Sequence, residues 1–249
     1  SRSACTTLVW KDRKTVVEDV ATADWSGIDI ALASAGKTAS LQYSPVMAEA
    51  GVTVIDNSSG WRNDPEVPLI VSEVNPQDLN NIPKGIIANP NCTTMAAMPV
   101  LAPLHRESGL EALVVATYQA VSGAGKASAD ELLNQTKDYL DGKKIKSKNF
   151  TKQIAFNAIP HIDVFSVDGY TKEELKMTNE TKKILDDKIN LTATCVRLPI
   201  SVSHAESVNL QFEKPFSLDK VREALNNFEG CKVIDERIDG GYLTPLEAE

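Results

Sequence analysis

The chain lacks the residue patterns that mark several classes of protein. Its 249 residues include only four cysteines and three histidines. The cysteines show no close pairing and no CxxC spacing, and the histidines are scattered, so neither a disulfide framework nor a metal site is expected. Reduced cysteines are typical of the cytoplasm, and we therefore expect a cytoplasmic protein.

Long apolar runs and extended positive charge are also absent. No stretch approaches the roughly 18 apolar residues of a membrane span, and the first residues do not resemble a signal peptide. The net charge is −8 at pH 7, and basic residues cluster only at 143–148. Because negative charge repels phosphate backbones and anionic lipids, we expect neither a nucleic acid nor a membrane as partner.

The first hundred residues alternate apolar runs with helical spacing. Strands are predicted at 15–17, 28–33, 52–56 and 69–71. The second and third runs are apolar enough to be buried on both faces. A helix is predicted over 37–50, ending before Gly51. This order predicts a parallel, doubly wound sheet, whose ligands bind at the carboxyl ends of the strands. Gly36 lies at one such end, although plain turn chemistry explains that loop equally well.

Near residue 92 the pattern changes to longer strands and amphipathic helices. Strands are predicted at 113–119, 194–198 and 208–212, a tight turn at 122–125, and helices at 93–108, 127–140, 171–189 and 218–228. Long antiparallel strands with amphipathic helices favour an α+β domain that contains a helix-covered sheet.

Cys92 stands where an apolar strand, residues 85–88, meets a proline and a helix begins. A thiol there lies at the positive end of the helix dipole. The unpaired N–H groups around it favour the thiolate and would hold a developing oxyanion. A buried structural role is the commoner fate of a lone cysteine. The residues that follow favour a nucleophile instead.

Three later polar residues suit the chemistry of a thiolate. Arg197 is the side-chain type that grips a carboxylate with two hydrogen bonds, and His204, seven residues on, suits acid–base work near neutral pH. Gln119 ends an apolar strand, where its amide could orient a substrate or cap a backbone edge. A surface ion pair for Arg197 and a loop position for His204 remain open alternatives.

Four segments, in order, carry a family resemblance. They are residues 55–62 (IDNSSGWR), 89–94 (NPNCTT), 118–125 (YQAVSGAG) and 197–204 (RLPISVSH). With them the chain resembles the aspartate-β-semialdehyde dehydrogenase family over nearly its whole length. The four together are far more specific than any one, because Cys-Thr-Thr after Asn also occurs in glyceraldehyde-3-phosphate dehydrogenases.

The resemblance implies a role for each matching residue. Cys92 would be the nucleophile, Gln119 the amide orienting the acyl intermediate, and His204 the acid–base group. Substrate binding falls to Arg197 for the α-carboxylate, Glu180 for the amino group, and Arg62, Lys183 and Asn91 for the phosphate. Glu173 and Glu174 lie on the same helical stretch as Glu180, and all three could be surface charges. Cofactor-binding positions would be Ser1, Arg2, Ser3, Gly36, Ser122 and Gly123.

The activity implied by the resemblance is the NADPH-dependent reductive dephosphorylation of L-aspartyl-4-phosphate to L-aspartate-4-semialdehyde. It would proceed through a cysteine thioester and release inorganic phosphate, in lysine, threonine and methionine biosynthesis. The implied fold is α/β, with an incomplete Rossmann-like dinucleotide-binding domain over 1–91. A catalytic and dimerisation domain with a mixed sheet covers 92–249. A homodimer or homotetramer without a metal is expected.

The chain departs from the family pattern at both ends. No Gly-rich G-x-T-G-x-V-G turn is present, and the family would continue beyond residues 244–246, so we expect an internal piece of a longer protein. No acidic residue precedes Asp12, and Ser1-Arg2-Ser3 favours NADP over NAD. Two alternatives stay open: another acyl-phosphate reductase, such as an N-acetyl-glutamyl-phosphate reductase, and a catalytically incompetent fragment.

Overall fold

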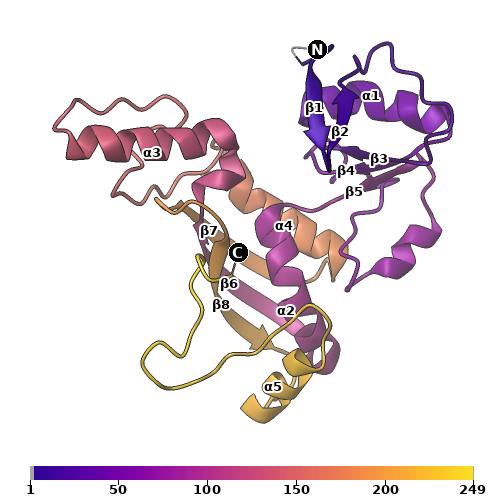
Figure 1. Ribbon diagram of the computed structural model, residues 1–249. Coiled ribbons are helices and arrows are strands. Elements are labelled where there is room, and N and C mark those ends of the chain that lie inside the picture. Colours follow the sequence, from indigo (N-terminus) through magenta and orange to yellow (C-terminus); the bar gives the residue numbers. More distant parts are fainter. Residues whose placement is uncertain (1–2, 249) are drawn as a thin grey trace. The chain divides into compact units, whose positions relative to one another are not determined.

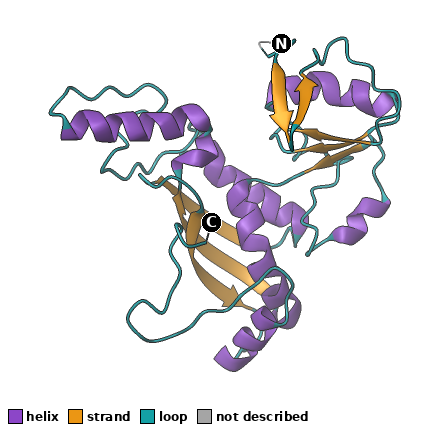
Figure 2. Ribbon diagram, viewed as in Figure 1, coloured by secondary structure: helices purple, strands orange, loops and turns teal. Residues whose placement is uncertain are grey.

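The computed structural model describes residues 3–248 and separates into two compact units (Figure 1). The first unit comprises the described residues up to Ile70 together with Asn75–Pro90. The second comprises Val71–Val74 and the chain from Asn91 onward. Each unit has its own sheet and helices (Figure 2).

The first unit is built on three parallel strands in the order β3-β4-β5. These are β3 (Ile30–Ala33), β4 (Thr53–Asp56) and β5 (Ile86–Ala88). Helix α1 (Lys37–Glu49) crosses from β3 to β4 and stops at Ala50. Gly51 then adopts φ 91°, the left-handed conformation that glycine accepts most readily after a helix. The predicted parallel strand–helix–strand unit is therefore confirmed.

Three details of this unit differ from the sequence prediction. Residues 69–71 are not a strand, because only Leu69 forms a bridge, to Ala88. An unpredicted strand β1 (Thr7–Trp10) forms an antiparallel hairpin with β2 (Arg13–Val16). The expectation that the run at 28–33 is buried was wrong, since Leu32 is 80% exposed. β3 is the edge of the described sheet, so it is paired on one side only.

The second unit is centred on β6 (Leu110–Gln119), which pairs with strands on both sides. β7 (Asn190–Arg197) runs parallel to it and β8 (His204–Phe212) antiparallel. The sheet is therefore mixed, as predicted, although only one of the two pairings is antiparallel. Helices α2 (Cys92–Ser108) and α4 (Lys172–Ile184) pack against this sheet.

Two of the remaining helices begin within one residue of their predicted starts, at 127 and 218, whereas a helix at 76–80 was not predicted and a short 3-10 helix stands where a tight turn was predicted at 122–125. These helices are η1 (Pro76–Asn80) in the first unit and η2 (Val121–Ala124), α3 (Lys126–Leu140) and α5 (Leu218–Asn226) in the second. α4 ends at Ile184 rather than at 189, because the side chain of Asp186 accepts a hydrogen bond from the N–H of Lys188 and starts a turn. Across residues 3–248, no helix has both the length and the apolarity to span a membrane.

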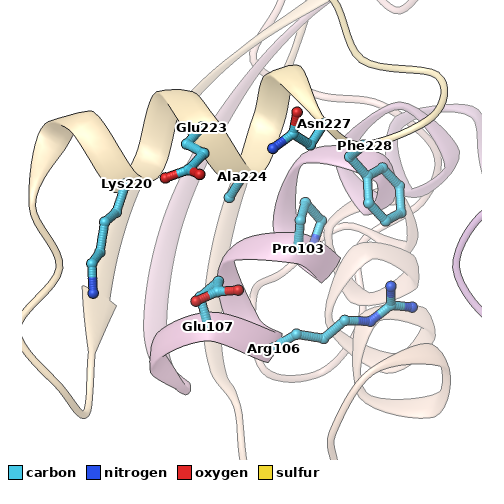
Figure 3. A pocket seen from close by; sticks show the side chains of 8 residues that line it. All are labelled: Pro103, Arg106, Glu107, Lys220, Glu223, Ala224, Asn227 and Phe228. Atoms are coloured by element: carbon cyan, nitrogen blue, oxygen red, sulfur yellow. The ribbon is translucent and has the colours of Figure 1, made fainter.

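Helix α5 packs beside the end of α2 that is remote from Cys92. Figure 3 shows the groove between them, which is lined by charges of both signs. The guanidinium of Arg106 lies 5.6 Å from the ring centroid of Phe228, a cation–π contact at the edge of this groove.

Helix α3 is joined to the loop that follows it by two buried polar side chains. The carboxylate of Glu131 accepts from the N–H groups of Lys148 (3.0 Å) and Asn149 (2.6 Å). Gln135, 2% exposed, accepts through its amide oxygen from the N–H groups of Ile154 (2.9 Å) and Ala155 (3.2 Å). These bonds satisfy backbone groups that the loop buries.

Replacing Gln135 tests this account of the loop. Gln135→Ala leaves two buried N–H groups without an acceptor and should lower the free energy of unfolding by about 2–4 kcal/mol. Asn134→Ala, on the exposed face of the same helix, should change it by less than about 0.5 kcal/mol. Urea denaturation measures both, and equal losses would contradict the proposed role of Gln135.

Candidate active site

The candidate site in the second unit begins with three side chains in one row across the sheet. In the register of the strands, Gln119 of β6 is paired with Arg197 of β7 on one side and His204 of β8 on the other. Gln119 and Arg197 are 1% and 5% exposed, so both polar side chains are buried at the end of the sheet. The mixed sheet therefore brings together residues that are up to 85 positions apart.

Cys92 is the first residue of α2, and Asn91 caps the helix. The side-chain oxygen of Asn91 accepts from the N–H of Thr93 (3.2 Å) and from its hydroxyl (2.6 Å). The Sγ atom of Cys92 lies 3.2 Å from Nε2 of His204. The predicted position of a thiol at a helix N-terminus is confirmed, and an imidazole stands within reach of it.

The protonation of Cys92 corrects a simple expectation from the helix dipole. Neighbouring protein atoms displace water from around the thiol, which disfavours the charged thiolate and raises the pKa of Cys92. The negative charge of Glu173 raises this pKa further. The N–H of Thr93 and the positive charge of Arg197 act in the opposite direction but do not outweigh them. The helix end by itself therefore does not leave Cys92 as a thiolate in this structure.

His204 can serve as either a proton donor or a proton acceptor toward Cys92. Its Nδ1 lies 3.0 Å from the N–H of Ala120, which donates, and 2.9 Å from the carbonyl oxygen of Ser203, which accepts. One tautomer presents a bare Nε2 to the thiol and the other an Nε2–H. Burial lowers the pKa of His204, with Ser203 and Glu173 opposing, so the imidazole is neutral near pH 7.

Arg197 is held in place by the backbone at the end of β6. Its Nη1 donates to the carbonyl oxygen of Ala120 at 2.5 Å. A Cβ atom added at Gly123 would lie 3.2 Å from Nη1 of Arg197 and 3.3 Å from Nε2 of His204. Gly123 therefore lets the turn after β6 approach both side chains closely, which a larger residue would hinder.

Glu173 is the acidic side chain that joins this site to α4. It is 5% exposed and accepts from the side-chain amides of Gln119 (3.0 Å) and Asn91 (3.2 Å) and from Lys176 (2.9 Å). Burial raises the pKa of Glu173, but the cation of Lys176 and these hydrogen bonds outweigh it, so the pKa is lowered. The pKa of Lys176 is correspondingly raised, against the effect of its own burial.

Glu180 and Lys183 repeat the same spacing one heptad further along α4, with different contacts. Glu180 is 2% exposed and accepts from the backbone N–H of Asn91 at 2.6 Å. Lys183 is exposed. The family resemblance assigned the roles toward substrate to these two residues, while Glu173, Glu174 and Glu180 could all have been surface charges. A usable signal was the capping box of Thr171 and Glu174, which sets the first turn of α4 and brings Glu173 into it.

The other predicted residues fall in several places. In the first unit Arg62 is 7% exposed and donates to the backbone oxygens of Asn89 (2.8 Å) and Asn57 (3.2 Å). Gly36, at φ 89°, is the N-cap of α1, and Ser3 lies in an exposed turn. In the second unit Ser122 lies in η2. Ser1 and Arg2 lie outside the described residues.

No group of three or more His, Cys, Asp or Glu side chains within residues 3–248 is placed to hold a metal ion. The thiol, imidazole and guanidinium of the second unit are the reactive groups that the structure brings together at this site. They suit covalent chemistry on a substrate that carries an anionic group.

Two family models match the chain, one on each side of residue 92. "Semialdehyde dehydrogenase, NAD binding domain" matches residues 3–82, and "Semialdehyde dehydrogenase, dimerisation domain" matches residues 101–249. With the thiol–imidazole pair, these matches define the chain as an oxidoreductase with a nicotinamide-cofactor domain and a domain for oligomerisation.

Individual relatives narrow this class. The chain is 51% identical over 228 residues to aspartate-semialdehyde dehydrogenase of Aquifex aeolicus, covering 90% of this chain and 67% of the relative. It is 48% identical to the enzyme of that name from Streptomyces akiyoshiensis, covering 93% and 71%. A crystal structure of aspartate semialdehyde dehydrogenase II from Vibrio cholerae matches with TM-score 0.88 and 44% identity, covering 92% and 69%. The chain belongs to the aspartate-semialdehyde dehydrogenase family.

The charge of Glu173 should be measurable at Cys92. Glu173→Gln removes the negative charge that raises the pKa of the thiol, so alkylation of Cys92 by iodoacetamide at pH 7.5 should become about three- to tenfold faster. Mass spectrometry distinguishes Cys92 from Cys5 and Cys231, while burial raises the pKa of Cys195 to about 12 and leaves it unreactive.

Glu174→Gln is the matched control for this measurement. Glu174 neighbours Glu173 on α4 but accepts from the N–H of Cys195. Its substitution should leave the rate at Cys92 unchanged within about twofold. A slower or unchanged rate in Glu173→Gln would show that Glu173 does not set the reactivity of Cys92.

Proposed function

We propose that this chain catalyses the NADPH-dependent reductive dephosphorylation of L-aspartyl-4-phosphate to L-aspartate-4-semialdehyde through a thioester on Cys92. The observation that carries the proposal is the contact of 3.2 Å between Sγ of Cys92 and Nε2 of His204, beside the buried Arg197. Membership of the family supports it. The proposal places the protein in lysine, threonine and methionine biosynthesis, as a cytoplasmic homodimer.

The first chemical step needs a thiolate, and His204 supplies the base. With its proton on Nδ1, facing the carbonyl oxygen of Ser203, His204 accepts the thiol proton of Cys92 at Nε2. The thiolate then attacks the carbonyl carbon of the acyl phosphate. The carbon–oxygen bond to phosphate breaks, the phosphate leaves and takes up a proton from solvent, and a thioester remains on Cys92.

Charged side chains around the thiol fit the charges of the substrate. Arg197 supplies a guanidinium for the α-carboxylate, which a planar fork binds with two hydrogen bonds. For the amino group the geometry favours Glu173 over Glu180, because Glu173 contacts Gln119 while Glu180 is occupied with the N–H of Asn91. The cation of α4 that pairs with Glu173 is Lys176, at 2.9 Å, whereas Lys183 is exposed.

Gln119 is fixed at both ends of its amide. Its oxygen accepts from the Thr117 hydroxyl at 2.8 Å and its nitrogen donates to Glu173 at 3.0 Å. A side chain held in this way can define the position of an acyl group on Cys92 without moving itself. This is the role we assign to it.

The features of the first unit fit a nicotinamide dinucleotide. α1 begins after a parallel strand, at Gly36, with no side chain capping its N-terminus, and a Cβ added at Gly36 would meet no atom within 4 Å. An open, uncapped helix start suits a phosphate group. When bound, the cofactor supplies hydride to the thioester carbonyl. The choice of NADP over NAD rests on Ser1, Arg2 and Ser3.

His204 also completes the reaction. The proton that it took from Cys92 remains at Nε2, 3.2 Å from the sulfur. When the reduced adduct collapses to the aldehyde, the carbon–sulfur bond breaks and the departing thiolate takes this proton back. The enzyme is thereby returned to its starting protonation state.

Replacing His204 tests the function and its mechanism together. The assay follows NADPH formation from L-aspartate-4-semialdehyde, phosphate and NADP. His204→Asn retains a polar group but cannot exchange the proton, so kcat should fall by about 10²–10⁴-fold with little change in KM. Activity of the parent chain with no loss in His204→Asn would remove His204 from the mechanism, and an inactive parent chain would contradict the proposed function.

The role of Glu173 toward the amino group has a sharper test in substrate choice. Succinate semialdehyde differs from L-aspartate-4-semialdehyde only in lacking the amino group. Glu173→Gln should lower kcat/KM for the amino substrate by about tenfold or more relative to succinate semialdehyde. Glu180→Gln should not change this ratio, and the reverse pattern would return the role to Glu180.

A further inference from the structure

A second row of side chains crosses the sheet two positions away from the row formed by Gln119, Arg197 and His204. Thr117 of β6 is paired with Cys195 of β7 and with Glu206 of β8. Thr117 and Cys195 lie two positions before Gln119 and Arg197, and Glu206 lies two positions after His204. Both rows therefore face the same side of the sheet. The hydrogen bond from the Thr117 hydroxyl to the Gln119 amide oxygen, 2.8 Å, joins the rows.

Glu206 is an unusual member of this second row. Both of its carboxyl oxygens are buried, and neither has a hydrogen-bond partner. Burial raises the pKa of Glu206 to about 7. The carboxyl group is therefore largely uncharged in mildly acidic solution and becomes ionised as the pH rises above neutrality.

The groups facing Glu206 explain why its charge is not compensated. Thr117 is paired with Glu206 from the neighbouring strand β6, Cys195 lies beyond Thr117 on β7, and His204 precedes Glu206 by two positions on its own strand. From α4, Glu173 and Glu174 add negative charge near Cys195. The buried residues of α2, which also packs against β8, include no ionisable side chain. The cation Arg197 lies one row away, at the far edge of the sheet.

Thr117 has one hydroxyl hydrogen, and its polar neighbours are Gln119 on its own strand, Cys195 on β7 and Glu206 on β8. With Glu206 uncharged, that hydrogen is donated to Gln119, whose nitrogen then points to Glu173. An ionised Glu206, directly across from Thr117 in the register, is the stronger acceptor and competes for the same hydrogen. Losing it would release the Gln119 amide from one of its two anchors.

We propose that Glu206 is a positioning residue. While its carboxyl group is uncharged, the Thr117 hydroxyl stays donated to Gln119 and holds the Gln119 side chain in place. When Glu206 is ionised, the Thr117 hydroxyl donates to its carboxylate instead, and the Gln119 amide oxygen loses this hydrogen bond. The structural part of this proposal stands without the proposed function, and its effect on turnover rests on that function.

The structural part is tested by NMR on the full chain labelled with ¹⁵N-glutamine. The side-chain amide of Gln119, assigned by its absence in Gln119→Glu, should shift in the parent protein with a midpoint near pH 7. In Glu206→Gln, which is permanently uncharged, and in Thr117→Val, which has no hydroxyl, this titration should be absent. A Gln119 resonance that does not titrate in the parent, or titrates equally in either variant, overturns the proposal.

Stability provides an independent readout of the buried carboxyl. The pKa of Glu206 is raised from 4.5 to about 7 on folding, so its contribution to stability is lost as the pH rises through that window. The unfolding constant of the parent relative to Glu206→Gln should increase by about a hundredfold or more between pH 4.5 and 8. Glu111→Gln, an exposed carboxylate on β6, is the matched control and should show no such change. A ratio that is independent of pH would overturn the proposal.

The catalytic part is tested by the pH profile of the proposed reaction. The ratio of kcat/KM for Glu206→Gln over that of the parent should be near one at pH 6 and rise about tenfold by pH 8.5. A constant ratio with a titrating Gln119 resonance would overturn the catalytic part alone. If the parent is inactive, the proposed function fails, and the NMR and stability measurements still decide the positioning role.

Discussion

The buried carboxylate of Glu173 connects three elements of the second unit: α4, the start of α2 at Asn91, and the end of β6 at Gln119. A charge with this little solvent exposure is tolerable only when it is fully hydrogen-bonded and paired, and Lys176 and the two amides meet that condition. Removing it would break the connection between Asn91, which caps α2, and the side-chain amide of Gln119. The position of Cys92 thus depends on an interaction outside its own helix.

The negative charge of Glu173 also makes the Cys92 thiol less reactive when no substrate is bound. Glu173 raises the pKa of Cys92, while Arg197 lowers it. A substrate that brings an amino group to Glu173 and a carboxylate to Arg197 would change both influences on the sulfur. Reactivity in such an arrangement is decided by the occupied site rather than by the helix dipole, which acts against larger opposing effects.

The mixed sheet provides the register that makes these interactions possible. Arg197, Gln119 and His204 meet because β7 and β8 pair with β6 at these positions, and Cys195, Thr117 and Glu206 meet one step behind. A slip of one residue in either pairing would turn the side chains of that strand to the opposite face. The hydrogen bond from Thr117 to Gln119 joins the two rows, so a change in the row of Glu206 can affect the row of Gln119.

Much about this protein was determined by the sequence alone. Apolar runs and their spacing predicted most helices and strands to within a few residues, because local propensity and periodicity act over short distances. The apolar strand that meets a proline just before Cys92 predicted a thiol at a helix start for the same reason.

Only the tertiary structure decided which charged side chains of α4 contact Gln119. Glu173 and Lys176 have the same spacing as Glu180 and Lys183, so periodicity cannot separate them, and the packing of α4 against the sheet brings Glu173 to Gln119 while Glu180 reaches the N–H of Asn91. The exposure of Leu32 and the burial of Glu206 were equally unreadable from composition. Burial and charge pairing depend on neighbours distant in the chain, and these long-range contacts exist only once the fold has formed.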